Sequence, residues 1–144
     1  MILFLVTLGL AAEHRLEPEK LPTSVKDAVH ARYADATITA ASREGRAYEA
    51  TITLGTRTMD LAFSADGTWL EEEEVVGADL LPEPVRTAIE GRWKGWSIVR
   101  AERAITPKST SYEVLIRSGE QSAEAVLGED GSVKRVEMGE EEED

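Results

Sequence analysis

The sequence predicts an α+β fold: two tandem helix-plus-four-strand repeats form an antiparallel sheet, with the helices packed on one face. Three observations predict it. One helical pattern occurs twice, strand-like alternation follows each occurrence, and an Asp-Gly pair closes the match between the copies. A self-similar pattern indicates one structural unit built twice. Since a unit this small buries little core alone, the two units are expected to share one core.

Both predicted helices carry a single apolar stripe. In "LPTSVKDAVHARY", residues 21–33, and "LPEPVRTAIEGRW", residues 81–93, apolar side chains recur at i, i+4, i+7, i+8 and i+12. That spacing lines up one side of a helix. Pro22 and Pro82 lie at the helix starts, where a missing backbone N–H is tolerated. Each helix should therefore cover a sheet with one face.

Strands follow each helix. The expected strands lie at 36–43, 48–54 and 59–63 in the first copy and at 97–103 and 112–116 in the second. Apolar and polar residues alternate in the longer runs, which indicates strands with one buried and one wet face. A Pro-containing insertion at 106–109 belongs in a loop of the second copy.

The pairs Asp66-Gly67 and Asp130-Gly131 predict tight hairpin turns, but the turn length is open. With a two-residue loop, Phe63 pairs with Leu70 and Trp69 faces outward. With a three-residue loop and a bulge, Phe63 pairs with Trp69, which is then buried. The two-residue register would place Trp69 in an exposed apolar patch, the usual mark of a partner site. The candidate partner-binding residues are Trp69, Leu115, Val126 and Val133.

The order of these features resembles the PepSY-like, β-lactamase-inhibitor-like family. The resemblance rests on "LP..V..A....Y", the Tyr-Glu pairs at 48–49 and 112–113, and "F..DG..L" from Phe63, and it covers about residues 21–137 in two copies. It implies helices against one face of a curved antiparallel sheet, export to the bacterial periplasm or cell surface, and a binding or inhibitory role. It carries over no catalytic residue. The last strand of the second copy matches the pattern poorly.

The chain organisation follows from composition. The apolar run 1–10 and Ala11-Ala12 look like the core and cleavage site of a secretory signal that lacks its basic start, as a truncated signal would; a buried first strand is the alternative. No other segment is apolar enough to cross a membrane, so a periplasmic or secreted protein is expected. The expected segments are a signal peptide at 1–12, a linker at 13–20, repeats at 21–76 and 81–138, a linker at 77–80, and a disordered acidic tail at 139–144.

Charge and residue types limit the function. The net charge is −12, with 16 basic and 28 acidic residues, which disfavours nucleic acid and anionic lipid as partners. There is no cysteine, and His14 and His30 have no catalytic companions. The sequence therefore predicts no enzyme and no cofactor. It favours a secreted or periplasmic non-catalytic module that binds a protein partner, with inhibition of a hydrolase as the sharper hypothesis.

The acidic run Glu71–Glu74 suggests an alternative. With Asp66 nearby in the sequence, Glu71, Glu72, Glu73 and Glu74 are candidate ligands for a divalent cation, because calcium binds several carboxylate oxygens. This would make the chain an acidic calcium-binding or envelope-stress protein. The competing interpretation is a solvated edge strand whose charges prevent aggregation.

Overall fold

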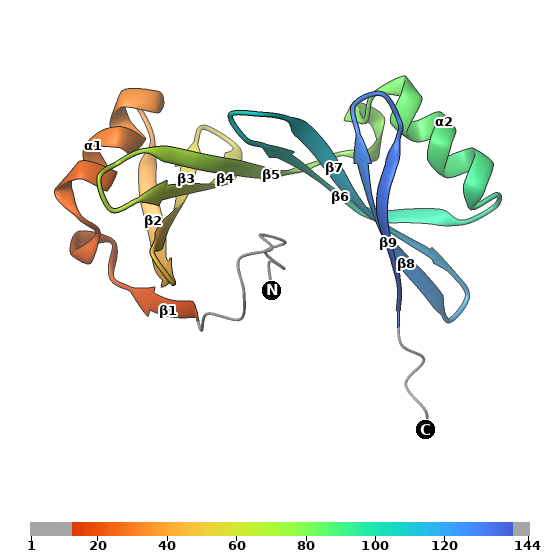
Figure 1. Ribbon diagram of the computed structural model, residues 1–144, viewed down its shortest axis with the longest axis horizontal. Coiled ribbons are helices and arrows are strands. Elements are labelled where there is room, and N and C mark those ends of the chain that lie inside the picture. The colour runs from red at the N-terminus through yellow and green to blue at the C-terminus, as the bar shows by residue number, and fades with distance from the viewer. Residues whose placement is uncertain (1–12, 140–144) are drawn as a thin grey trace. The chain divides into compact units, whose positions relative to one another are not determined.

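The computed structural model describes residues 13–139; the predicted signal segment and residues 140–144 of the acidic tail lie outside the described residues. Figure 1 shows the elements along the chain. In chain order they are β1 (Glu13–Leu16), η1 (Pro18–Lys20), α1 (Thr23–Arg32), β2 (Thr37–Glu44), β3 (Ala47–Leu54), β4 (Arg57–Ser64), β5 (Trp69–Val76), η2 (Ala78–Leu80), α2 (Glu83–Arg92), β6 (Ser97–Ile105), β7 (Thr110–Ser118), β8 (Gln121–Gly128) and β9 (Val133–Met138).

The chain divides into two compact units, and each is described by itself. The first unit runs to Leu70 and the second begins at Glu71. The division falls inside β5, whereas the sequence predicted the end of the first repeat at residue 76. It falls there because residues 72–76 pair with β6 and so belong to the sheet of the second unit.

In the first unit, strands β1 to β4 pair in chain order and are all antiparallel. Helix α1 turns Val25 and Val29, both fully buried, toward the strands. The core cluster of this unit consists of Leu21, Val25, Val29, Ala36, Ala41, Ala50, Ile52, Met59, Leu61 and Phe63. Alternation along β3 and β4 places these side chains on the helix-covered face, as the period of a strand requires.

The second unit repeats this arrangement. Strands β5 to β9 pair in chain order, again antiparallel, and helix α2 turns Val85 and Ile89 toward them. Its core cluster consists of Leu81, Val85, Ile89, Trp93, Ala101, Tyr112, Val114, Ile116, Ala123, Ala125 and Leu127. The buried residues thus form two clusters, one within each unit, and not the one common core expected. Each helix already covers the apolar positions of its own strands.

The segments 13–20 and 77–80, which the sequence predicted as linkers, contain regular structure. Residues 13–16 form β1, which pairs with β2 and places Arg15 opposite Ser42. Three of its four side chains are exposed, so the strand lacks the apolar alternation by which strands are recognised in a sequence. Residues 78–80 form η2, the equivalent of η1 in the first unit.

The two Asp-Gly turns adopt the three-residue register. The Ser64 N–H donates to the Thr68 carbonyl at 2.9 Å, and Gly67 has a φ of +86°. Trp69 consequently packs against the first core, while Leu70 is 38% exposed. In the second unit Leu127 lies opposite Val133 for the same reason. Positive φ at the glycine lets the strand re-enter the sheet with a bulge.

Candidate functional site

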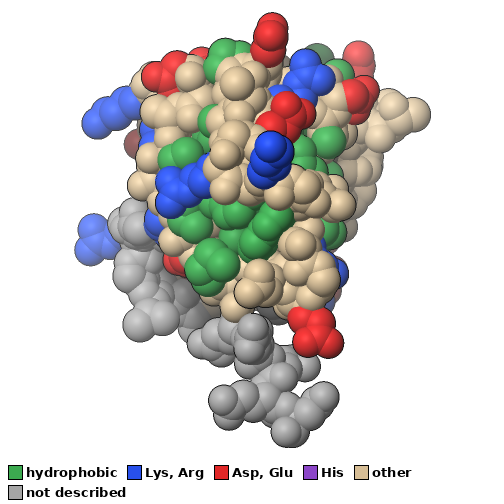
Figure 2. All heavy atoms as spheres, turned by 90° about the vertical axis from the view of Figure 1, so that its right-hand side faces the viewer, with side chains coloured by type: hydrophobic (Ala, Val, Ile, Leu, Met, Phe, Trp, Pro, Cys, Tyr) green, Lys and Arg blue, Asp and Glu red, His purple; other side chains and the backbone are tan. Residues whose placement is uncertain are grey.

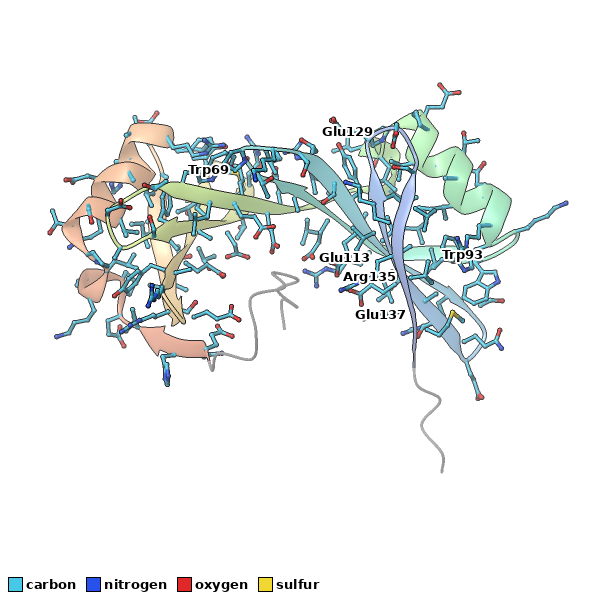
Figure 3. All side chains as sticks on the ribbon, viewed as in Figure 1. Trp69, Trp93, Glu113, Glu129, Arg135 and Glu137 are labelled. Carbon is cyan, nitrogen blue, oxygen red and sulfur yellow. The ribbon has the colours of Figure 1, made fainter. Side chains whose placement is uncertain are left out.

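Each unit has one sheet face covered by its helix and one face turned away from it. In the second unit we call the uncovered side the open face. Cross-strand pairing arranges it in two rows: Val75, Glu102, Glu113, Val126 and Arg135 in one, and Arg100, Leu115, Glu124 and Glu137 in the next. Figure 3 shows Glu113, Arg135 and Glu137 on the side of the strands away from α2. Apolar and charged side chains are therefore mixed on this face.

The candidate partner-binding residues divide between the two faces. Leu115 and Val126 lie on the open face, as expected, opposite Glu124 and Glu113. Val133 packs against the second core. Trp69 packs against the first core, and the Arg32 guanidinium lies 3.8 Å from the centre of its ring. The outward placement of Trp69 and Val133 is therefore wrong, because it depended on a two-residue turn.

The candidate cation ligands are not brought together. Asp66 stays in the turn, where one carboxylate oxygen accepts the Thr68 N–H at 3.1 Å. Along β5, alternation sends Glu72 and Glu74 to one side and Glu73 to the other; Glu72 is buried, and Glu74 pairs with Arg103 at 2.6 Å. Among residues 13–139, no cluster of three or more His, Asp or Glu side chains is arranged to hold a metal ion. The proposed calcium ligands thus point in different directions.

The first unit carries an open groove of about 880 Å³ beside its edge strand. It is lined by residues of β1, η1, β2 and β3, and Arg15, Lys20 and Thr39 are among them. The duplication assigns each of them an equivalent in the second unit: Val75, Leu80 and Val99.

These three equivalents are apolar and exposed. Val75 is 55% exposed, Leu80 69% and Val99 50%. Val99 lies at the bulge of β6, where Thr39 lies at the bulge of β2. Because the first unit builds the same elements with Arg, Lys and Thr, the fold does not require apolar residues there. Apolar surface is also visible on the side drawn in Figure 2, where hydrophobic side chains gather among charged ones.

A carboxyl pair on the open face is the feature that sequence reasoning missed. Glu113 of β7 and Glu124 of β8 are hydrogen-bonded to each other. Burial raises the pKa of Glu113 to about 8, together with the hydrogen bond and charge of Glu124 and the charges of Glu102 and Glu73. One Glu124 oxygen is buried with no hydrogen-bond partner. One carboxyl group is therefore held in its protonated form near neutral pH.

Two basic residues of the open face pair with carboxylates of the same face. Arg100 binds Glu102 at 2.6 Å, and Arg135 lies 3.5 Å from Glu137. A signal for the carboxyl pair exists in the sequence: Glu113 and Glu124 both fall on the wet phase of their strands. Their contact becomes visible only with the register, which places Leu115 opposite Glu124 and Val126 opposite Glu113.

The histidines form no catalytic group within the described residues. His14 is exposed on β1. His30 is an exposed helix residue whose two ring nitrogens lie 3.0 Å and 3.2 Å from the carbonyl oxygens of Lys26 and Ala36. Both contacts are to the backbone, so the His30 ring is not oriented by an acidic side chain.

Comparison with known proteins identifies relatives. The family model described as "Putative beta-lactamase-inhibitor-like, PepSY-like" matches residues 11–59 and 51–133. Curated proteins include no match. Two solved structures share the fold. A "BLIP-like protein" from Bacteroides fragilis is 24% identical, with a TM-score of 0.71 over 81% of this chain and 86% of that chain. A structure described as "putative periplasmic proteins" from Bacteroides eggerthii is 17% identical, with a TM-score of 0.75 over 81% of this chain and 88% of that chain. Within the described residues, no helix has the length and apolar character needed to span a bilayer.

Proposed function

The chain belongs to the PepSY-like family of "putative beta-lactamase-inhibitor-like" proteins, and on this premise we propose that it is an exported, non-catalytic module that binds a protein partner through the open face. The observation that carries the proposal is the mixture of apolar and charged side chains on the sheet face that no helix covers. Leu115 and Val126 provide apolar contact area, and the surrounding charges select the partner.

The relatives support the compartment and the type of role. One solved structure of the same fold is described as periplasmic and another as BLIP-like. We place the chain in the periplasm or outside the cell on this ground and on the apolar run 1–10. Inhibition of an exported hydrolase is the form of binding that the family name suggests, and it is the one to test first.

The test uses the purified full chain, cross-linked to envelope proteins of the cell that produces it. Leu115→Lys places a charge on the open face, whereas Met138→Lys introduces the same charge at a side chain that is 60% exposed near the chain end. We expect one protein to be captured by the parent and by Met138→Lys but not by Leu115→Lys. If the captured protein is a hydrolase, its activity should fall with added parent protein.

Two results would contradict the proposal. One is that no envelope protein distinguishes the parent from Leu115→Lys. The other is that a captured hydrolase keeps full activity at saturating protein, which removes inhibition and leaves binding alone. Thermal unfolding of both variants shows whether a lost interaction reflects lost folding.

A further inference from the structure

Strand β9 ends the strand order of the second unit, so among residues 13–139 it pairs on one side alone, with β8. The equivalent strand of the first copy is β5, whose residues 72–74 correspond by the duplication to 136–138. Those residues pair with β6, the next strand in the order. The fold therefore accepts an antiparallel neighbour at a position where β9 has none. The backbone groups of such an edge are a template for another strand.

The backbone of Val136 faces this free edge. Gly139, which directly follows β9, donates its N–H to the Ser122 carbonyl oxygen at 2.8 Å, on the β8 side. The backbone N–H and C=O of one residue point to the same side of an antiparallel strand, and that side alternates along the chain. Glu137 and Arg135 therefore direct these groups toward β8, and Val136 directs them away from it. A strand that docks on this edge exchanges hydrogen bonds with Val136.

The charged side chains of β9 are complementary to those of a second copy of β9. Arg135 and Glu137 lie on the open face, on either side of Val136 in the chain (Figure 3). Their side chains are 31% and 54% exposed. In an antiparallel pair centred on Val136, Arg135 of each copy lies opposite Glu137 of the other. Centring the pair on Arg135 or on Glu137 instead places like charges opposite each other, which is unfavourable.

We propose that the chain forms a twofold-symmetric dimer in which the β9 strands of two copies pair antiparallel about Val136. The two Val136 residues exchange backbone hydrogen bonds, and two Arg135–Glu137 pairs flank them on the open face. The twofold axis is perpendicular to the sheet, so the open faces of both copies lie on the same side. The inference is independent of the proposed function, which concerns what binds to that face.

The pairing segment is short, so the dimer should be weak. Strand β9 has six residues, and Lys134 has no partner in its register with β8. Pairing of so few residues buries less than the roughly 1,200 Å² of a stable interface, and we expect a Kd on the order of 0.1 mM. The net charge of −12 on each copy opposes association at low ionic strength. A salt concentration of about 0.15 M screens charges more than about 8 Å apart and leaves those at the interface in effect.

Sedimentation equilibrium of the full chain at concentrations up to about 1 mM measures the dimer. Arg135→Glu and Glu137→Arg each place two pairs of like charges across the axis and should raise the Kd at least about tenfold. An equimolar mixture of the two variants has opposite charges at both places again and should associate as the parent does. The controls Arg86→Glu and Glu90→Arg, at exposed positions of α2, make the same changes in net charge. They should alter the Kd less than about twofold, alone or mixed.

Amide hydrogen exchange tests the backbone pairing. At about 1 mM protein the Val136 amide should exchange about fivefold more slowly than at about 10 µM, because most chains are then dimeric. The Glu137 amide, which points toward β8, should exchange at the same rate at both concentrations. Equal slowing of the two amides would contradict the proposed register. Thermal unfolding of each variant shows whether a lost dimer reflects lost folding.

Three results would overturn the proposal. The parent stays monomeric at about 1 mM, in which case the charges of β9 act only to protect its edge. Arg135→Glu dimerises as well as the parent, which places the contact elsewhere. The mixed variants stay monomeric while the parent dimerises. Capture of an envelope partner is measured at about 1 µM, where the chain is monomeric, so failure of the dimer and failure of the proposed function are separate results.

Discussion

At the scale of single residues, Glu113 couples the stability of the second unit to pH. Its pKa is raised from 4.5 to about 8 in the folded state. Between these values the folded protein keeps a proton that the unfolded chain has lost, so the free energy of unfolding falls as pH rises and levels off above pH 8. The carboxyl group therefore costs stability in neutral and alkaline solution.

Glu113→Gln removes this cost. Because the side chain is partly exposed, solvent screening reduces the effect, and we expect the free energy of unfolding at pH 8 to rise by about 1 kcal/mol. Near about pH 3, where the parent carboxyl is protonated in both states, the gain should almost vanish. Urea unfolding at both pH values measures it, with exposed Glu129→Gln as the control. An equal gain at the two pH values would contradict the assignment.

The residue-scale features could be predicted only in part. Alternation places Glu113, Leu115, Glu124 and Val126 on the wet phase of their strands, and the structure agrees. It does not indicate which of them meet, because contact across strands depends on register. The register also shows that Leu115, which cannot donate a hydrogen bond, lies opposite Glu124. At the equivalent place in the first unit, the Thr51 hydroxyl donates to Asp60.

At the scale of elements, the hairpin turns decide which side chains are buried. Asp-Gly is compatible with loops of two or three residues. Lengthening the loop by one residue moves the Trp69 side chain from the solvent side of the sheet to the core side. The deciding interaction is the Ser64–Thr68 backbone hydrogen bond, matched by Gly128–Ser132 in the second unit. Because both are backbone hydrogen bonds, the residue types at these positions do not reveal the loop length in the sequence. Strand β1 could not be recognised either, since its residues show no apolar period.

The turns also carry a requirement for glycine that can be measured. Gly131 has a φ of +83°, and an added Cβ would lie 2.4 Å from the Pro84 carbonyl oxygen at the start of α2. Gly119 has a φ of +59° but open space around it. We expect Gly119→Ala to cost about 1 kcal/mol from backbone strain alone, and Gly131→Ala about 3 kcal/mol because the helix must also move. Denaturant midpoints compare the two; equal losses would show that the turn does not press on the helix.

At the scale of the whole molecule, duplication explains why the fold is predictable while the uncovered sheet faces of the two copies differ. The helical stripes and alternating strands are dictated by burial, so they recur in both units and can be recognised from the sequence. The sheet faces that no helix covers, and their borders, do not have to bury apolar side chains. They have diverged from Arg15, Lys20 and Thr51 in one unit to Val75, Leu80 and Leu115 in the other.

Because the buried residues form two clusters, a cavity in one core should act mainly on its own unit. Val25 and Val85 are equivalent, and both are fully buried. We expect Val85→Ala to lower the opening free energy of amides in β7 and β8 by about 2 kcal/mol and to leave those of β3 and β4 nearly unchanged. Val25→Ala should do the reverse. Hydrogen exchange resolved by residue measures both variants, each serving as the control of the other. Equal loss of protection in both units from either substitution would show that the chain opens as one cooperative body, and the two cores would then have to be treated as one.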